Sequence, residues 1–489
     1  MFIELHIIQN FPPSNLNRDD TGQPKGTDFG GMPRARISSQ SLKRSIRYAG
    51  KDPKDTDTKA KSVFERYTQV PLADRTKLIV LEITRRMTEV KKESKEEANL
   101  LARAFADAYA GGMDSNDERK TNVLLYMSDK ELEYIASKLI ENWDALLAAL
   151  SPETPLDQIA QQLTEKISQR ATEPAKGEAI RSSNLSKEIQ ARLENNGKNN
   201  KAAKATASAF KKAFKSDVKA FTAEELDWAG SEIVRRWNEI QAQMNAQSPL
   251  MPIVSELIKE TKGRTSAPDI ALFGRMLADK PDTNIDAACQ VAHAISTHTV
   301  SRNDIDYFTA VDDLQPKEET GAGFLDVAYF NSACFYRYAR VDFELLKKNL
   351  AGANDANLPY RTVEAFLRAS EAAIPSGKKN SHAQECRPDF MLAVLRSSNS
   401  AGWSLVNAFE KPVNAQSENG LIEGSIHRLD KYFNRQLEFY DDDSVQALAV
   451  ALPSGAVSAD SLSQTLRDAV KPKMSEWVSA ICEPLRNGA

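Results

Sequence analysis

The order of hydrophobic patterns along the chain is the feature that most limits the folds it can adopt. Apolar and polar residues alternate at residues 2–8, as in a half-buried strand, whereas the block from about residue 59 to 265 has a helical pattern. The expected strands are residues 2–8, 289–297, 333–343 and 389–395, with a helix as the alternative for 289–297, a helix at 361–373, a long loop at 298–330 and a helical remainder after 395. This order is typical of an α+β domain whose sheet is interrupted by two excursions.

A basic segment at residues 34–47 carries five cations and no anion, although the whole chain has a net charge of -4. We expect it to contain a helix, because Ser38 or Ser39 can cap the helix start by accepting a hydrogen bond from a free N–H group. Gly50 can end the helix in the left-handed conformation.

This helix is predicted to have two different faces. At about 100° per residue, one face gathers Leu42, Ile46 and Ala49, and the opposite face gathers Gln40, Lys43, Arg44 and Arg47. The unpaired N–H groups and partial positive charge of a helix N-terminus place Ser38, Ser39 and Gln40 where a phosphate can bind. A solvated basic face is the alternative interpretation.

The polar loop at residues 15–31 leads into this segment and is rich in glycine and turn residues. Arg18 and Lys25 add cations beside the expected helix start. Asp19, Asp20 and Asp28 are turn residues in one interpretation and acidic ligands in the other.

A second basic stretch, at residues 198–219, has seven lysines and a single acidic residue in an alanine-rich helical pattern. Lys204, Lys211, Lys212 and Lys215 belong to it. Such a helix could dock on an acidic partner or on a phosphate backbone, and we consider these lysines as possible DNA-binding residues. The alternative is a solvated lysine face.

Cysteine and histidine spacing gives no indication of a metal site. The four cysteines form no C-x-x-C pair and the five histidines form no H-x-x-x-H pair, which argues against zinc and against a disulfide framework. No run approaches the ~20 apolar residues of a membrane span, and the first residues lack the features of a signal peptide. We therefore expect a cytoplasmic protein without membrane association, metal or other cofactor.

Eight ordered segments carry a resemblance to a known family. They are LNRDD at 16–20, FGG at 29–31, RISSQSLKR at 36–44, IALFGRM at 270–276, AHAISTH at 292–298, DIDYFTAVDDLQ at 304–315, FYRY at 335–338 and NAFEK at 407–411. These segments resemble CasC, the backbone subunit of the type I-E CRISPR surveillance complex called Cascade. The resemblance does not extend to residues 62–266.

The resemblance implies an RRM-like, or ferredoxin-like, palm with an inserted α-helical finger domain and a long thumb loop. The palm would comprise residues 1–58, 266–297 and 331–489, the finger 59–265 and the thumb 298–330. The helical insertion is longer than we expect of this family, so its role is not given by the resemblance.

For function, the resemblance implies a non-catalytic, cytoplasmic subunit that oligomerises as a helical filament on the spacer of a CRISPR RNA. The filament presents the RNA for base pairing with target DNA in antiviral defence. The implied partners are CRISPR RNA, target DNA, other copies of the chain, the large subunit, the small subunits, the 5′-end capping subunit and the endoribonuclease that processes CRISPR RNA.

The resemblance also transfers RNA-contacting roles to individual positions. These are Arg18, Lys25, Ser38, Gln40, Lys43 and Arg44, a wedge at Met276, a basic glycine loop at Gly377, Lys378 and Lys379, and the thumb residue Phe308. Cations and N–H donors of this kind hold phosphates without reading the sequence, which leaves base edges free to pair.

Two alternatives belong to other functional classes. Backbone subunits of the related type III complexes cleave RNA with metal assistance, and Asp28, Asp19 and Asp20 are the local candidates for such a role. The other alternative is a stand-alone protein that binds single-stranded RNA and has no need of a long thumb.

Overall fold

The computed structural model describes residues 1–52, 60–92, 94–114, 117, 119–150, 187, 190, 191, 231, 250–277, 281–300, 304–310, 314, 325–397, 402–416 and 420–487. The chain divides into two compact units. One unit comprises Met1–Ala73 and Thr261–Ala489, and the other comprises Asp74–Glu260.

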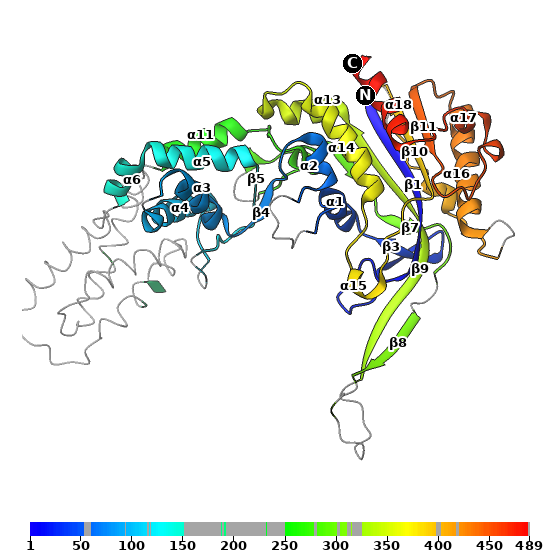
Figure 1. Cartoon of the computed structure of the whole chain (residues 1–489), viewed down its shortest axis with the longest axis horizontal. Coiled ribbons are helices and arrows are strands. Elements are labelled where there is room, and N and C mark those ends of the chain that lie inside the picture. The colour runs from blue at the N-terminus through cyan, green and yellow to red at the C-terminus, as the bar shows by residue number, and fades with distance from the viewer. Residues whose placement is uncertain are drawn as a thin grey trace, which may run out of the picture. The chain divides into compact units, whose positions relative to one another are not determined.

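The first unit is built on a sheet in which every named strand pairing is antiparallel (Figure 1). Its strands are β1 (Phe2–Ser14), β2 (Gly26–Phe29), β3 (Met32–Ile37), β6 (Cys289–Val291), β7 (Ala294–Ser296), β8 (Asp304–Thr309), β9 (Leu325–Asp342), β10 (Phe390–Arg396) and β11 (Val445–Ala451). The spatial order is β11-β10-β1-β9-β7-β3-β2, and both β6 and β8 also pair with β9. The long strand β9 therefore connects most parts of the sheet.

Helices cover the sheet on both faces. One face packs against α1 (Ser39–Arg47), α2 (Val63–Thr68), α12 (Pro268–Phe273), α13 (Phe343–Asn349), α14 (Leu358–Ala372) and α18 (Met474–Asn487). The other face packs against α16 (Gly420–Phe439), α17 (Gln464–Arg467) and the 3-10 helix η3 (Val406–Phe409). This combination of helices with an antiparallel sheet agrees with the predicted α+β class.

Strand β1 lies in the middle of the sheet, between β10 and β9, and helices cover it on both faces. Ile3, Leu5 and Ile7 are buried against the layer that contains α14, while Glu4 and His6 on the opposite face are also fully buried. Glu4 accepts a hydrogen bond from Nε of Arg396 at 2.7 Å. The predicted strand at residues 2–8 is confirmed, but it is buried on both faces rather than half-buried.

Other strand predictions have mixed outcomes. The segments predicted at 333–343 and 389–395 lie in β9 and β10, and the segment at 289–297 forms two short strands, β6 and β7. The prediction that everything after residue 395 is helical was wrong, because β11 pairs with β10 along residues 445–451. A short run of alanine, leucine and valine fits a helix or a strand equally well. Here the pairing with β10, which is distant in sequence, makes it a strand.

The segment predicted to be a long loop at 298–330 contains an ordered β-ribbon. Strand β8 pairs with the outer third of β9, from Asp304 opposite Phe330 to Thr309 opposite Leu325. This ribbon extends beyond the rest of the sheet (Figure 1).

The described part of the second unit is mainly helical, as predicted. It contains β4 (Asp74–Thr76), α3 (Ile79–Val90), α4 (Lys95–Ala110), β5 (Leu125–Met127), α5 (Asp129–Glu141) and α6 (Trp143–Leu150), followed by α11 (Met251–Thr261) at its end. A capping box between Ser128 and Glu131 begins α5. Lys204, Lys211, Lys212 and Lys215 lie outside the described residues. Among the helices in the described ranges, none is long and apolar enough to cross a membrane.

Candidate nucleic-acid interface

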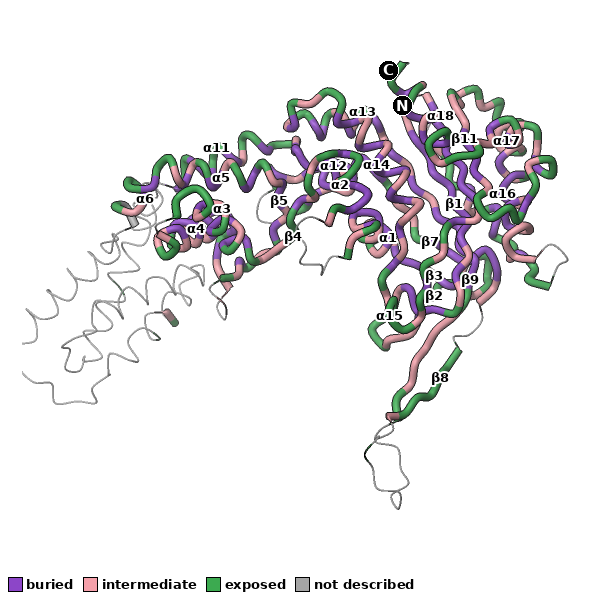
Figure 2. Tube along the Cα trace, in the orientation of Figure 1, coloured by how far each residue is buried: buried purple, intermediate pink, exposed green. Residues whose placement is uncertain are grey.

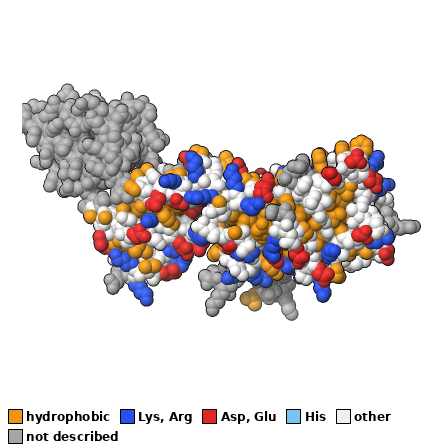
Figure 3. Space-filling view, turned by 90° about the horizontal axis from the view of Figure 1, so that it is seen from above, with side chains coloured by type: hydrophobic (Ala, Val, Ile, Leu, Met, Phe, Trp, Pro, Cys, Tyr) orange, Lys and Arg blue, Asp and Glu red, His pale blue; other side chains and the backbone are white. Residues whose placement is uncertain are grey.

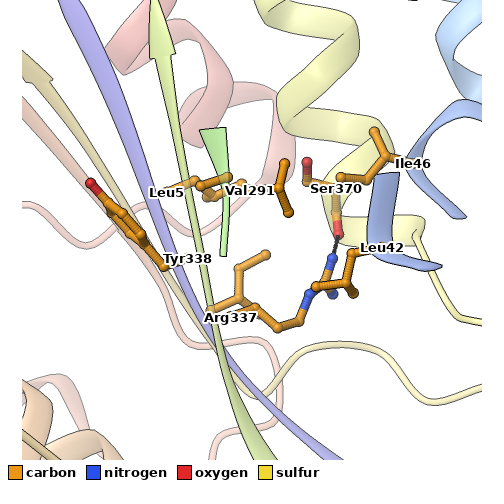
Figure 4. Close-up of a pocket in the computed structure, with 9 residues that line it drawn as sticks. Leu5, Leu42, Ile46, Val291, Arg337, Tyr338 and Ser370 are labelled. Atoms are coloured by element: carbon orange, nitrogen blue, oxygen red, sulfur yellow. Dashed lines mark hydrogen bonds between the residues drawn. The ribbon is translucent and has the colours of Figure 1, made fainter. Parts of the chain in front are cut away.

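Helix α1 forms at the predicted place and with the predicted cap. The Ser38 hydroxyl accepts a hydrogen bond from the Ser41 N–H at 3.3 Å, and Gly50 adopts a φ of 75°, in the left-handed region, after the helix ends. Leu42 and Ile46 are buried against the sheet and α14. In Figure 4 they face Leu5 and Val291 across a cavity of only about 10 Å³, near the minimum volume for one water molecule. Close packing therefore fixes the inner face of α1.

The inner side of this region also contains two of the five cations in the basic segment. Arg47 is buried, not exposed with Lys43 and Arg44 as predicted, because its long side chain turns back toward the start of α12. Its Nε donates to Oδ2 of Asp269 at 2.9 Å, and its Nη2 donates to the Ala73 carbonyl at 2.9 Å.

Arg34, on β3, is only 1% exposed and is enclosed by carbonyl groups. Its guanidinium donates to the carbonyls of Ser296 at 3.0 Å, Phe409 at 2.8 Å and Glu410 at 3.0 Å. Burial lowers the pKa of Arg34, although the charge of Glu410 acts in the opposite direction. Arg34 thus links β3 to β7 and to the segment that follows η3.

The outer side of α1 presents the remaining polar and cationic residues. Gln40 and Arg44 are exposed, and Lys43 is half-buried. The Arg44 guanidinium lies 5.2 Å from the centroid of the Tyr48 ring, and Lys43 Nζ lies 5.9 Å from the centroid of the Phe273 ring. These cation–π contacts orient both cations on the surface of the helix.

The N-terminal N–H groups of α1 are mostly satisfied by the protein itself. The Ser38 N–H donates to Oδ1 of Asn17 at 2.9 Å, and the Ser39 N–H donates to Nδ1 of His293 at 2.8 Å. With the Ser41 N–H bound to the cap, the N–H of Gln40 is the only one of these four without an acceptor among the described residues. A phosphate at this helix start would therefore meet Gln40.

The loop that carries Arg18 and Lys25 is held directly against α1 and β3. The Lys25 N–H donates to the Asn17 carbonyl at 2.9 Å, and the Arg36 N–H donates to the Lys25 carbonyl at 2.8 Å. Since Asn17 also accepts from Ser38, the half-buried Lys25 and the exposed Arg18 lie beside the helix start.

Asp19 is used inside this loop. Its carboxylate accepts hydrogen bonds from the Thr21 N–H, the Thr21 hydroxyl and the Gln23 N–H, at 2.8–2.9 Å. The bond from the Thr21 side chain, together with the backbone N–H groups, lowers the pKa of Asp19. This geometry is that of a turn residue.

The glycine loop lies next to the same segment. A Cβ atom on Gly377 would lie 2.4 Å from the Leu16 carbonyl oxygen and 2.5 Å from that of Asn15, so only glycine allows this close approach. Lys378 and Lys379 follow at the start of α15 (Lys379–His382), and both are exposed. The loop predicted to carry RNA-binding lysines is thus adjacent to the loop that carries Arg18.

Met276 projects from a short turn after α12 and is 85% exposed. Arg275 and Ile285 exchange backbone hydrogen bonds of 3.0 and 2.9 Å across this turn, and the Leu277 N–H donates to Oδ1 of Asn284 at 2.6 Å. Since Phe273 contacts Lys43, the turn is connected to the outer side of α1.

Sequence analysis missed His293 and Arg36 as members of this surface. Burial, together with the positive charges of Arg36 and Lys25, lowers the pKa of His293. Its ring nitrogen is therefore available as the acceptor for the Ser39 N–H at neutral pH. The place of His293 beside the helix start is revealed by its contact with Ser39, which is distant in sequence. The residue spacing around His293 does not predict this contact.

A cavity of about 400 Å³ opens between the 19–28 loop, the β2–β3 hairpin and the root of β9. Its lining includes both signs of charge, from Asp19, Lys25, Asp28 and Arg34. Nowhere in the described ranges do three His, Cys, Asp or Glu side chains gather as a metal site would require. On the face of the molecule seen in Figure 3, cations and anions are interspersed over the described residues.

The interface therefore combines elements that are far apart in sequence. The contacts described above join residues 18–25, α1, the turn at Met276 and the loop at Lys378–Lys379. Phe308, in contrast, lies on the projecting ribbon, where it is 39% exposed and stands opposite Asp326.

Comparison with known proteins gives one sequence family and two similar structures. The model of the CT1975-like protein family matches residues 3–175 and 160–479. One solved chain, from a CRISPR RNA-guided surveillance complex described as pre-nicking, is 23% identical, with a TM-score of 0.62 and 99% of each chain covered. A second chain, from a CRISPR RNA-guided surveillance complex, is 20% identical, with a TM-score of 0.58 and the same coverage. No curated protein matches the sequence.

Proposed function

The chain belongs to the CT1975-like protein family, and from this premise we propose that it is a non-catalytic backbone subunit of a type I-E CRISPR surveillance complex. Copies of the subunit oligomerise along the spacer of a CRISPR RNA and present it for base pairing with target DNA in antiviral defence. The similar fold of two chains from CRISPR RNA-guided surveillance complexes supports this proposal.

An RRM-like palm is supported by the connectivity of the first unit. The elements β1, α1, β6, β9, α14 and β10 follow one another in a β-α-β-β-α-β order, with other elements between them. In space these four strands are arranged β10-β1-β9-β6, which is the arrangement of a ferredoxin-like sheet. We assign the second unit to the finger and the β8–β9 ribbon to the thumb.

The single observation that carries the proposal is the convergence of cations from separate segments on one side of this palm. Arg18 and Lys25 adjoin the start of α1, the glycine loop with Lys378 adjoins Leu16, and Lys43 adjoins the turn at Met276. Phosphates are bound by such groups without regard to sequence. This suits a subunit that leaves sequence recognition to base pairing.

Several parts of the proposal concern roles beyond RNA binding. The Asp19 carboxylate is used within its own turn, which accounts for one of the three candidate aspartates without a catalytic role. Target DNA, other copies, the large and small subunits, the capping subunit and the processing endoribonuclease are the proposed partners. We assign a DNA-binding role to Lys204, Lys211, Lys212 and Lys215 because they belong to the stretch at residues 198–219 that has seven lysines and a single acidic residue.

The proposal is tested by purifying the subunit with a CRISPR RNA and measuring particle mass and RNase protection. We expect particles that contain several copies and protect the RNA at regular intervals. A variant that lacks residues 303–320 should fold and bind short RNA but should not form the ordered filament. Particles of normal mass with periodic protection from this variant would contradict the thumb assignment. Wild-type protein that purifies without bound RNA would contradict the proposed function.

A further inference from the structure

Three aromatic side chains form an exposed cluster in the first unit. Phe439 ends α16, Tyr440 follows it, and Trp403 comes from the segment before η3. Their exposed fractions are 76%, 65% and 55%, and the end of α16 lies on the surface (Figure 2). The Trp403 and Tyr440 rings are nearly parallel with centroids 6.4 Å apart, and the Phe439 ring meets Tyr440 edge-on at 5.0 Å. We call this the aromatic cluster. Exposed apolar groups that gather in this way usually mark an interaction site.

Buried charges hold the aromatic cluster in place. Arg396, at the end of β10, donates from Nε to Glu4 and from Nη1 to Asp442 and to Ser444 Oγ, the last at 2.9 Å, in the turn after α16. The second carboxylate oxygen of Glu4 accepts from the Trp403 N–H. Glu4 and Arg396 are 0% and 2% exposed. Because this network fixes the backbone on both sides of the aromatic cluster, the rings are already ordered before a partner binds, which lowers the entropy cost of binding.

The rim of the aromatic cluster is acidic. Residues 438–443 include four carboxylates and no cation, and of these Asp442 is paired with Arg396. Glu438, Asp441 and Asp443 are exposed and form no ion pair with any residue that the structure describes. They stand at the C-terminus of a 20-residue helix, where the partial negative charge of the helix adds to their own. The end of α16 therefore attracts a cation.

Elsewhere in the same unit, arginines lie over aromatic rings. The Arg368 guanidinium is 4.5 Å from the centroid of the Tyr67 ring, and the Arg340 guanidinium is 4.7 Å from that of Phe2. Among the described residues, no lysine or arginine lies over the rings of the aromatic cluster. A planar guanidinium can stack on such a ring while its N–H groups donate to carboxylates at the rim. An arginine from another molecule matches both features.

The aromatic cluster is remote from the candidate nucleic-acid interface. Helix α16 and η3 cover the face of the sheet opposite to α1. Along the sheet, Glu4 stands opposite Arg340, whereas the projecting ribbon begins at Phe330 (Figure 1). These two positions on β9 are about 33 Å apart at the rise of an extended strand. The exposed carboxylates also repel phosphates, so a protein fits this surface better than a nucleic acid.

We propose that the aromatic cluster, with Glu438, Asp441 and Asp443 at its rim, is a docking surface for a different protein that places an arginine side chain on these rings. A second copy related by two-fold symmetry would bring like carboxylates together, which opposes such a contact. The inference goes beyond the proposed function, because it gives the chain an attachment site that does not involve RNA.

Photo-cross-linking in the cells that naturally produce the chain identifies the occupant. p-Benzoylphenylalanine replaces Phe439, or Lys348 on α13 as an exposed control, and the adducts of the full chain are mapped by mass spectrometry. We expect position 439 to give protein adducts in clear excess over position 348, in an arginine-containing segment of a different polypeptide. Adducts to nucleic acid or to this same chain, a segment without arginine, or no excess over position 348 would overturn the proposal.

A charge variant tests the chemistry of the surface against the partner so identified. Glu438→Gln with Asp443→Asn removes two rim carboxylates and keeps their size, and it should weaken binding of that partner about tenfold. The matched control is Glu476→Gln with Glu483→Gln, two exposed carboxylates on α18, which should leave binding unchanged. Equal melting temperatures establish that both variants are folded. Equal affinities of the two variants would overturn the role of the rim.

A substitution on the partner separates stacking from charge. Replacing its cross-linked arginine by lysine keeps the positive charge and removes the planar group, so binding to the wild-type chain should weaken. Unchanged affinity would overturn the role of the rings.

Discussion

The inner and outer sides of the β3–α1 region use the same kind of charge in different ways. On the inner side, Arg34 and Arg47 are buried and their guanidinium groups donate to carbonyls and to Asp269. On the outer side, Lys43 lies over the ring of Phe273 and Arg44 over the ring of Tyr48. The inner cations connect distant segments, and the outer ones are available to a partner.

This difference shows that the charge of a segment overstates its capacity to bind a polyanion. A planar guanidinium with five donors can satisfy several buried carbonyls at once, which an ammonium group cannot do. Both buried cations are accordingly arginines, and they hold β3 and α1 in the position from which Lys43 and Arg44 project. Three of the five cations in residues 34–47 remain for the interface, namely Arg36, Lys43 and Arg44.

The largest expected effect comes from an inner cation. Arg47→Met keeps an apolar stem but leaves the fully buried Asp269 carboxylate without its 2.9 Å partner. We expect the free energy of unfolding to fall by about 3–5 kcal/mol, as when one member of a buried ion pair is removed. Denaturant titration measures this change.

A double-mutant cycle shows whether the unpaired charge is the cause. Asp269→Asn keeps an oxygen that can accept from the Ala73 N–H, now 3.2 Å away, but removes the charge. The Arg47→Met/Asp269→Asn variant should therefore be more stable than Arg47→Met alone. If the two substitutions are simply additive, the inner role of Arg47 is packing rather than ion pairing.

The outer cations should affect binding and leave stability unchanged. Lys43→Ala with Arg44→Ala removes two phosphate contacts, so the slope of log affinity against log salt should fall by about 1.4, with roughly tenfold weaker RNA binding at moderate salt. Thermal stability should stay within about 0.5 kcal/mol of the wild type. The matched control is Lys347→Ala with Lys348→Ala, a pair at the end of α13, which should change neither quantity.

An unchanged salt slope in the Lys43/Arg44 variant would contradict a phosphate role for the outer side. Equal losses in the control pair would indicate that general surface charge, rather than position on α1, governs RNA binding.

Local sequence patterns predicted the parts of this region that depend on neighbouring residues. Helical spacing placed Leu42 and Ile46 inside, and the serine before the helix identified the cap, because both effects operate within one or two turns. The basic loops at Lys25 and Lys378 were predicted from local composition and family resemblance. Their adjacency depends on Gly377, which meets the backbone of a segment more than 300 residues away.

The features that sequence patterns did not predict depend on long-range partners. The inward turn of Arg47 requires Asp269, and the enclosure of Arg34 requires carbonyls from Ser296 and from the end of η3. Strand β11 requires β10 as its partner. The β8–β9 ribbon requires the register between its two strands, which a pattern with little periodicity does not reveal.

A smaller effect on stability is expected at Ser38, which caps α1 between β3 and the helix. Ser38→Ala removes the acceptor for the Ser41 N–H, and we expect a loss of about 1 kcal/mol in the free energy of unfolding. Ser45→Ala removes a hydroxyl that donates to the Ser41 carbonyl within the same helix, and it should cost about 0.5 kcal/mol or less. Thermal unfolding of both variants provides the measurement, and equal losses would mean that the cap is not what fixes the helix start.

The smallest effect concerns pH and His293, which connects the outer cations to the helix start. Burial and the charges of Arg36 and Lys25 lower its pKa from the ordinary value of 6.5. As the pH falls below 6.5, the unfolded chain takes up a proton before the folded one, so this contribution to stability is complete above that value and declines through the folded pKa. His293→Asn retains an oxygen that can accept from the Ser39 N–H but does not titrate.

Wild-type protein should therefore lose slightly more thermal stability than His293→Asn between about pH 7.5 and about pH 5.5. RNA affinity should change in the opposite direction, because a phosphate beside Arg36 and Lys25 favours the imidazolium form and wild-type binding then strengthens as the pH falls. Melting temperatures of the two proteins across this pH range measure the change in stability, and RNA titrations measure the change in affinity. Parallel pH profiles for the two proteins would remove His293 from the interface and leave it as a structural acceptor for α1 alone.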